Sequence, residues 1–127
     1  MTTIDRLAPR LVVEGADAAI AFYTEALGAK ELNRHDDGAG HIVHSELQLG
    51  NHVIMVKDAD DTDPAPTQLG GTPVILALDA GDVDALGQRM IDAGATVVFP
   101  IETREYGRGG RLRDPYGHQW MVSQSLP

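Results

Sequence analysis

Two glycine landmarks occur twice in the chain at nearly equal separations, which indicates an internal duplication. Gly28 and Gly94 each end a helical pattern and are each followed by an alanine. Gly50 and Gly117 each lie in a tight turn between apolar runs, and their separation differs from that of the first pair by one residue. A duplicated chain folds into two similar modules, so this feature limits the architecture more than any single motif does.

The first copy is expected to contain a strand, a helix and three strands, because its hydrophobic period changes from two to about 3.6 residues and back. Asp17 stands where a helix N-cap is expected, and an apolar stripe containing Phe22 and Tyr23 ends at Gly28. The turn Gly50-Asn51 is typical of a tight hairpin. These elements are predicted at residues 7–13, 18–27, 29–34, 41–49 and 52–57.

The second copy repeats this order after an acidic segment, residues 58–71, that contains prolines and glycines and is expected to be a mobile linker. Asp82 or its neighbour is the expected N-cap of a helix that stops at Gly94. Residues 102–110 are rich in glycine and are expected to form a loop. Strands are predicted at residues 73–78, 95–101, 111–113 and 118–124.

Composition excludes several classes of function. The chain has 127 residues, which suits one domain, and a formal net charge of −9. Such a charge disfavours nucleic acid and anionic membranes as partners, because both require basic protein surface. Cysteine is absent, which excludes disulfides and thiolate metal sites. The start of the chain lacks the apolar run of a secretory signal and no segment is long enough to span a membrane, so a cytoplasmic location is expected.

Several short motifs, taken in order, resemble the vicinal oxygen chelate superfamily, the glyoxalase, bleomycin-resistance and dioxygenase group. They are Ala19-Ile20-Ala21-Phe22-Tyr23, Leu27-Gly28-Ala29, Gly94-Ala95 and Asp114-Pro115-Tyr116-Gly117-His118-Gln119-Trp120. The resemblance implies an α+β fold in which two βαβββ modules form incomplete barrels. A single domain over residues 1–127 is expected, with module one at 5–57, the linker at 58–71 and module two at 72–125. It also implies a homodimer whose clefts are built from both subunits.

Enzymes of this superfamily hold a divalent metal at four strand positions, and this chain keeps one potential ligand there. The positions correspond to residues 8–10, Glu46, residues 73–74 and Met121. Only Glu46 offers a metal-binding oxygen. The resemblance therefore implies a cleft without metal, with His44 and Glu46 as the remaining weak candidates for metal ligands.

Side chains alternate along a strand, so His44, Glu46 and Gln48 are expected on one face of the strand at 41–49. If Glu46 faces the cleft, His44 faces it too. Such a pair is suited to holding a metal or to acid–base chemistry. A half-buried polar face held together by hydrogen bonds remains the alternative.

Other candidates for ligand contact are the adaptable side chains of Met55 and Met121 and the residues in or beside the glycine-rich loop, Tyr106 and Arg111. Core filling and a solvated loop are the corresponding structural alternatives. Trp120 adjoins Met121 and therefore points to the opposite face, into the core or a subunit interface.

Two functions are compatible with these observations. The first is a binding protein that sequesters an antibiotic or another small molecule in a dimer cleft without a cofactor. The charge of −9 would favour a cationic ligand if the groove itself is acidic. The alternative is a lyase, isomerase or dioxygenase that uses His44 and Glu46 with or without a divalent metal, in which a partly dry cleft raises the pKa of Glu46.

Overall fold

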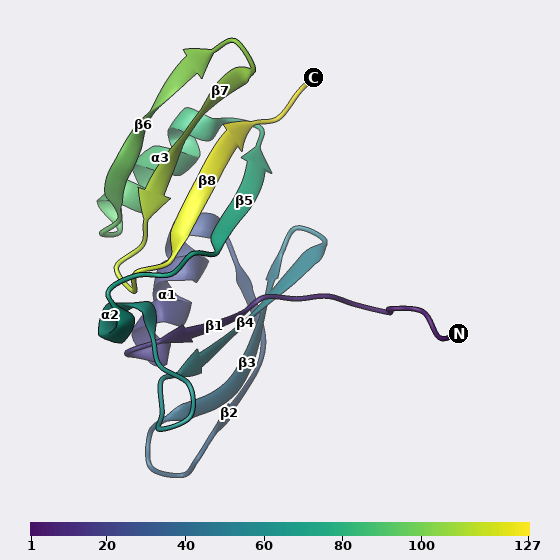
Figure 1. Ribbon diagram of the computed structural model, residues 1–127, viewed down its shortest axis with the longest axis vertical. Helices are drawn as coiled ribbons and strands as arrows, with labels where there is room; N and C mark the ends of the chain where they lie inside the picture. Colours follow the sequence, from purple (N-terminus) through teal and green to yellow (C-terminus); the bar gives the residue numbers. More distant parts are fainter.

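The computed structural model describes residues 1–127 and contains two modules with the same order of elements, followed in Figure 1 from purple to yellow. This confirms the predicted α+β fold. The elements of module one are β1 (Arg10–Val13), α1 (Ala16–Leu27), β2 (Lys30–Asp36), β3 (Ile42–Leu49) and β4 (His52–Asp58). A short helix, α2 (Pro66–Leu69), precedes β5 (Ile75–Ala80), α3 (Val83–Asp92), β6 (Thr96–Arg104), β7 (Gly107–Arg113) and β8 (Gln119–Gln124).

Each module forms a mixed four-stranded sheet in which the first strand pairs in parallel with the last. The strand orders are β1-β4-β3-β2 and β5-β8-β7-β6, and the remaining pairs are antiparallel. Neither sheet closes, because its two outer strands have no partner on their free edges. Figure 1 shows the two sheets end to end with α1 and α3 behind them. One face of each sheet is therefore covered by a helix and the other is open.

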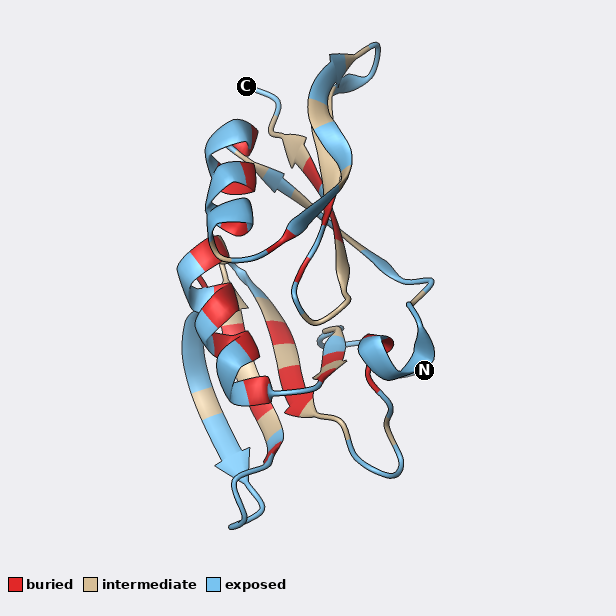
Figure 2. Cartoon of the chain, turned by 90° about the vertical axis from the view of Figure 1, so that its left-hand side faces the viewer, coloured by how far each residue is buried: buried red, intermediate tan, exposed pale blue.

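A single cluster of twenty buried residues joins both modules, and Figure 2 shows buried segments on the inner sides of the two helices. The predicted stripe of α1 is confirmed, since Ala19, Phe22 and Tyr23 are buried. Alternation along β8 is confirmed as well: Trp120 is 3% exposed in the core, whereas Met121 is 42% exposed on the open face. Removing such apolar side chains from water is the main stabilising contribution to the fold.

The turn after β7 fastens the two modules together. Asp114 is 3% exposed, and its Oδ1 accepts hydrogen bonds from the backbone N–H groups of Tyr116 and His118. Its Oδ2 accepts from Trp120 Nε1 at 2.9 Å and from the hydroxyl of Tyr23 in α1. The Asp-Pro-Tyr-Gly turn that the sequence predicts is therefore also the joint between the modules.

The N-cap prediction for α1 is wrong. Gly15 occupies the N-cap position with a positive φ of 88°, and no side chain of the helix caps it. Asp58, at the end of β4, accepts hydrogen bonds from the N–H groups of Gly15 at 3.2 Å and Ala16 at 2.8 Å. Its other oxygen accepts from Ile42 N. A carboxylate distant in sequence thus satisfies the helix terminus, and Asp17 instead pairs with Arg34 on the surface.

The acidic segment at 58–71 is more ordered than its composition predicts. The Lys57 ammonium donates to Asp60 Oδ2 at 2.7 Å and to Asp63 Oδ2 at 2.5 Å, which folds the segment back on the end of β4. Ala65 is fully buried at the start of α2. Local charge pairing therefore gives structure to a stretch in which hydrophobic periodicity is absent.

The glycine-rich stretch is strand rather than loop, so this part of the prediction is wrong. Strand β6 continues to Arg104 and β7 begins at Gly107, which leaves only a tight turn between them. A Cβ on Gly110 would lie 2.7 Å from the carbonyl oxygen of Phe99, and one on Gly109 would lie 2.5 Å from that of Val122. The glycines are required because the neighbouring backbone approaches closely. Because glycine has a low strand propensity, the sequence pattern did not predict this strand.

No helix of the structure has the length and apolar character that crossing a bilayer requires.

Candidate functional site

The open faces of the two sheets carry equivalent rows of side chains. In each row, residues on four adjacent strands lie opposite one another in register, with a methionine in the second place and a charged residue in the third. The first row is Arg10, Met55, Glu46 and Asn33, and the second is Ala77, Met121, Arg111 and Phe99. The duplication seen in the sequence therefore places Glu46 and Arg111 at matching positions in the two modules.

Glu46 is held by polar partners on the first open face. Asn33 Nδ2 donates to its Oε1 at 2.8 Å, and the Arg6 guanidinium lies 2.9 Å from its Oε2. The hydrogen bonds from Asn33 and Arg6 hold the pKa of Glu46 below its usual value. The expectation that a dry cleft raises this pKa is wrong, so Glu46 is poorly suited to act as a general base at neutral pH.

His44 lies beside Glu46 on the same open face, as the alternation predicts. Arg10 NH1 is 2.8 Å from His44 Nδ1, and the ring stacks on His35 with 6.1 Å between the centroids. Because a guanidinium only donates, Nδ1 must accept, which leaves the proton on Nε2. That Nε2 lies 3.9 Å from Glu46 Oε1. His44 and Glu46 are therefore part of a polar network with two arginines.

These residues do not fit a divalent metal in the arrangement that the resemblance implies. Arg6 and Arg10 place guanidinium groups at Glu46 and His44, where a cation would have to lie. The lone pair of His44 Nδ1 and an oxygen of Glu46 are already engaged in hydrogen bonds. No group of three or more His, Cys, Asp or Glu side chains gathers in the structure to complete a ligand set.

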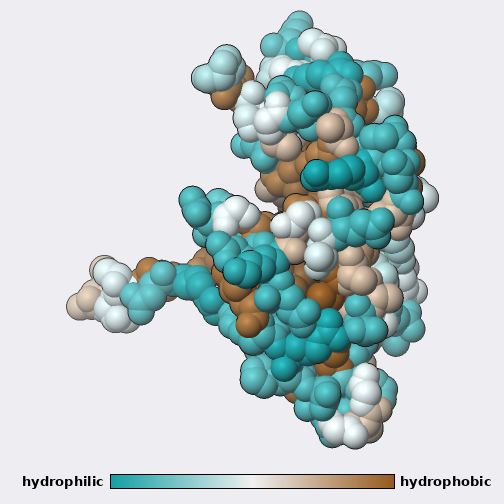
Figure 3. Space-filling view, turned by 180° about the vertical axis from the view of Figure 1, so that it is seen from behind, coloured by the Kyte–Doolittle hydropathy of each residue, from teal (hydrophilic) through white to brown (hydrophobic).

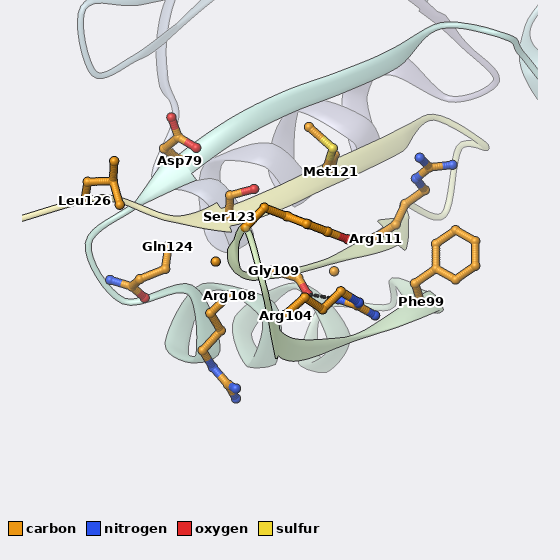
Figure 4. A pocket seen from close by; sticks show the side chains of 13 residues that line it. Asp79, Phe99, Arg104, Arg108, Gly109, Arg111, Met121, Ser123, Gln124 and Leu126 are labelled. Carbon is orange, nitrogen blue, oxygen red and sulfur yellow. Dashed lines mark hydrogen bonds between the residues drawn. The ribbon is translucent and has the colours of Figure 1, made fainter.

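The second open face holds a cavity of about 710 Å³, and every residue that lines it belongs to module two or the segment after β8. Figure 4 shows Arg111 beside the ring of Phe99, with Met121 on the neighbouring strand. The lining residues are Asp79, Phe99, Arg104, Tyr106, Gly107, Arg108, Gly109, Gly110, Arg111, Met121, Ser123, Gln124 and Leu126.

Arginine is the most frequent charged residue in the lining of this cavity, although the whole chain is acidic. Three arginines and one acidic residue, Asp79, line it. Arg108 points away in Figure 4 and binds Asp84 of α3 through two hydrogen bonds, while Arg104 donates to the carbonyl of Gly109. The expectation of an acidic groove is therefore wrong for this face, because the excess acidic residues lie elsewhere on the surface.

Arg111 carries the charge that remains unpaired. Its guanidinium carbon lies 5.3 Å from the centroid of the Phe99 ring, a cation–π contact. Its Nε is buried without a hydrogen-bond partner, and no carboxylate forms an ion pair with it. A buried donor without a partner is rare in folded proteins.

The structure brings the sequence candidates together in two groups rather than one. Arg111, Met121 and Tyr106 line the cavity of module two, with Tyr106 at its exposed rim in the β6–β7 turn. His44, Glu46, Gln48 and Met55 lie on β3 and β4 of module one, where Gln48 Nε2 donates to the carbonyl of Gly50. Whether these residues bind a ligand stays a prediction.

Sequence reasoning missed Phe99 and the arginines at positions 6, 10 and 104. Phe99 corresponds to Asn33 in the repeat, so alignment of the two copies through their strands was the available signal. The position of Arg6 had no such signal, because Arg6 lies before β1 and outside the repeat.

A second groove of about 920 Å³ lies between the modules on the helix-covered side. Its lining is mainly apolar and includes Leu49, Leu76, Leu86 and Trp120. Figure 3, which views the molecule from behind, shows apolar surface where its two halves meet.

Comparison with known proteins gives relatives over nearly the whole chain. An uncharacterized protein of Mycobacterium bovis is 41% identical, with 94% of this chain and 83% of the relative covered. An uncharacterized protein of Mycobacterium tuberculosis is also 41% identical, with 94% and 74% covered.

Solved structures share the fold. A gene product of Arabidopsis thaliana has a TM-score of 0.79 at 27% identity and covers 95% of this chain and 99% of its own. TioX from Micromonospora sp. ML1 has a TM-score of 0.77 at 26% identity, with 97% and 100% covered. The fosfomycin resistance protein FosX of Mesorhizobium loti has a TM-score of 0.72 at 12% identity, with 98% and 94% covered, which shows the fold alone. The sequence model of the Glyoxalase/Bleomycin resistance protein/Dioxygenase superfamily matches residues 3–122, and the chain belongs to that superfamily.

Proposed function

We infer that this protein binds a small organic molecule without a metal, in a cleft between the open face of module two and the open face of module one of a second copy. The observation that carries the inference is the cavity over β7 and β8, with the unpaired Arg111 beside Phe99 and Met121. Sites for small molecules combine apolar and aromatic lining with a few polar groups that fix orientation. The metal-ligand positions of the superfamily, by contrast, keep only Glu46, which Asn33 and Arg6 already engage.

Exposed apolar side chains on the second open face support the homodimer. The chain exposes 7762 Å², whereas a compact monomer of 13.6 kDa exposes about 6,600 Å². The extended start of the chain contributes to the difference, together with the two open faces. Apolar side chains on the second face are exposed, Phe99 by 52% and Met121 by 42%. Stable interfaces bury about 800 Å² on each partner, and exposed apolar side chains of this kind are what a second copy would cover.

Sequestration of an antibiotic is one form of this function, since the superfamily includes bleomycin resistance proteins. A protein that acts by capture needs affinity and an enclosed cleft, and it needs no acid–base group. The low pKa of Glu46 and its engagement by Asn33 and Arg6 agree with such a role.

Thermal-shift screening of small organic molecules, followed by amide NMR of the hits, tests the proposal. A ligand at 100 times its Kd should stabilise the fold by about 2.7 kcal/mol. Its resonance changes should centre on β7 and β8, and Met121→Trp, which fills the cavity, should remove binding. Ile91→Trp, at an exposed apolar position on α3, is the matched control and should leave binding unchanged.

Two results would contradict the proposal. One is a hit that binds Met121→Trp as tightly as the unaltered protein. The other is a stoichiometric divalent metal in protein purified without chelator, lost together with ligand binding in Glu46→Ala. Light scattering at micromolar concentration tests the assembly: a dimer is expected, and a monomeric mass would remove the two-subunit cleft.

A further inference from the structure

We propose that the cavity of module two selects an organic anion, with its carboxylate or an equivalent planar anionic group bound by Arg111 and its flat apolar body against Phe99. This rests on the proposed function, and it adds the charge and shape of the ligand. Three properties of Arg111 support it: the lack of a carboxylate partner, the contact with Phe99, and the loss of water that Arg111 would undergo if another surface covered β7.

Arg111 differs from the other arginines of the cavity in having no anionic partner. Arg108 is neutralised by Asp84, whose oxygens lie 2.7 and 2.9 Å from the guanidinium nitrogens. Arg104 is bound to the Gly109 carbonyl and lies 3.4 Å from Glu102. In a chain of net charge −9, a half-buried arginine without a carboxylate is unexpected, because acidic residues are abundant. The free positive charge therefore stands at one point of the cavity.

The geometry at Arg111 suits a planar anion. Its guanidinium carbon lies 5.3 Å from the centre of the Phe99 ring, and a guanidinium can give a carboxylate two parallel N–H hydrogen bonds. Phe99 and Met121 flank Arg111 on adjacent strands and remain about half exposed, so they offer apolar surface on both sides of the charge. A flat apolar body with one carboxylate matches this arrangement of charge and apolar surface.

Covering the face makes an anion necessary. When a second copy or any other surface closes over β7, the Arg111 guanidinium loses water, and a buried unpaired charge is strongly unfavourable. Glu46 occupies the equivalent position on the opposing face, but it already forms an ion pair with Arg6 and accepts a hydrogen bond from Asn33. An anionic ligand supplies the missing partner, so binding of the anion and closure of the cleft favour each other.

Three probes with the same naphthalene ring and different charge test the inference: 2-naphthoate, 2-naphthamide and 2-naphthylmethylammonium. Each is titrated into the full-length protein and followed by amide NMR and calorimetry. We expect 2-naphthoate to bind at least tenfold more tightly than the amide and the ammonium compound to bind most weakly. Arg111→Gln should abolish the difference between naphthoate and amide, and Arg111→Lys should retain part of it. Arg113→Gln is the control, because Arg113 is exposed on the same strand and does not line the cavity.

The outcomes separate this inference from the function on which it rests. Equal affinity for naphthoate and naphthamide, or preference for the ammonium compound, overturns the anion selectivity while the cavity remains a binding site. Unchanged binding of naphthoate to Arg111→Gln, in a variant that melts like the unaltered protein, overturns the role of Arg111. Absence of binding by all three probes at millimolar concentration overturns the anion selectivity, whereas the proposed function is overturned only by the screening results given for it above.

Discussion

The hydroxyl of Tyr23 donates a hydrogen bond of 2.5 Å to Oδ2 of Asp114, which links the helix of module one to the turn of module two. Trp120 Nε1 donates to the same oxygen at 2.9 Å. Burial, followed by the charge of Asp114, raises the pKa of Tyr23 well above its usual value, so the hydroxyl stays protonated and remains a donor. The orientation of one open face relative to the other depends on this joint.

Tyr23→Phe should destabilise the protein by about 1.5–3 kcal/mol, because a buried carboxylate loses one of its donors. Urea unfolding measures the change. Tyr116→Phe is the matched control: its ring lies 6.4 Å from that of Tyr23, and its hydroxyl has no hydrogen-bond partner in the protein. It should unfold within about 0.5 kcal/mol of the unaltered chain. Equal loss in both variants would contradict the role of the Asp114 hydrogen bond.

Asp58→Ala should destabilise the protein by about 1.5–3 kcal/mol, since the N–H groups of Gly15, Ala16 and Ile42 lose a charged acceptor. Asp17→Ala should cost less than about 1 kcal/mol, because Asp17 forms only an exposed ion pair with Arg34. Thermal or denaturant unfolding of the two variants compares them directly. A larger loss of stability in Asp17→Ala than in Asp58→Ala would support Asp17 as the helix cap.

The acidic segment after β4 should lose its order at low pH. Hydrogen bonds from Lys57, then from the backbone of Asp63 and Thr62, lower the pKa of Asp60 to about 2. A carboxyl with a depressed folded pKa contributes stability above its ordinary value of 3.8, and this contribution disappears as the pH falls toward about 2. Carbon NMR of the Asp60 carboxyl should give a midpoint near the lower value, and Lys57→Met should move it toward 3.8. A midpoint near 3.8 in the unaltered chain would count against the Lys57 contacts.

Gly110→Ala should destabilise the protein by about 1–3 kcal/mol, because the new methyl group would meet the backbone of β6 at 2.7 Å. Gly81→Ala is the control, since its φ is ordinary and a Cβ there meets nothing within 4 Å. Unfolding in guanidinium chloride distinguishes the two. A Gly110→Ala chain as stable as Gly81→Ala would show that β6 and β7 are not packed this closely.

The duplicated fold was predictable because its signals are local and repeated. Helix stripes, helix-ending glycines and strand alternation each depend on neighbouring residues, and the alternation that puts His44 with Glu46 and Trp120 opposite Met121 is a property of any strand. The superfamily motifs in addition predicted that the two βαβββ modules form incomplete barrels.

The missed features all depend on contacts between distant residues. The cap of α1 comes from Asp58, and the strand character of β7 depends on how closely β6 and β8 approach its glycines. The contact between Arg111 and Phe99 depends on the pairing register of β6 and β7. That register shifts on both sides of Phe99. The low pKa of Glu46 depends on Asn33 of the neighbouring strand and on Arg6, a residue outside the sheet. Composition and period carry no information on such contacts.

The matched rows on the two sheets have a consequence for how such a protein diversifies. Their side chains point away from the core, while ladder hydrogen bonds and buried residues elsewhere hold the backbone in register. Substitutions at exposed positions, such as Phe99 and Met121, usually change the folding free energy by less than about 0.5 kcal/mol. Ligand specificity can therefore change through substitution of a few residues in the two rows, while the backbone fold stays the same. A library restricted to Met55, Phe99, Arg111 and Met121 would explore new specificities with few unfolded members.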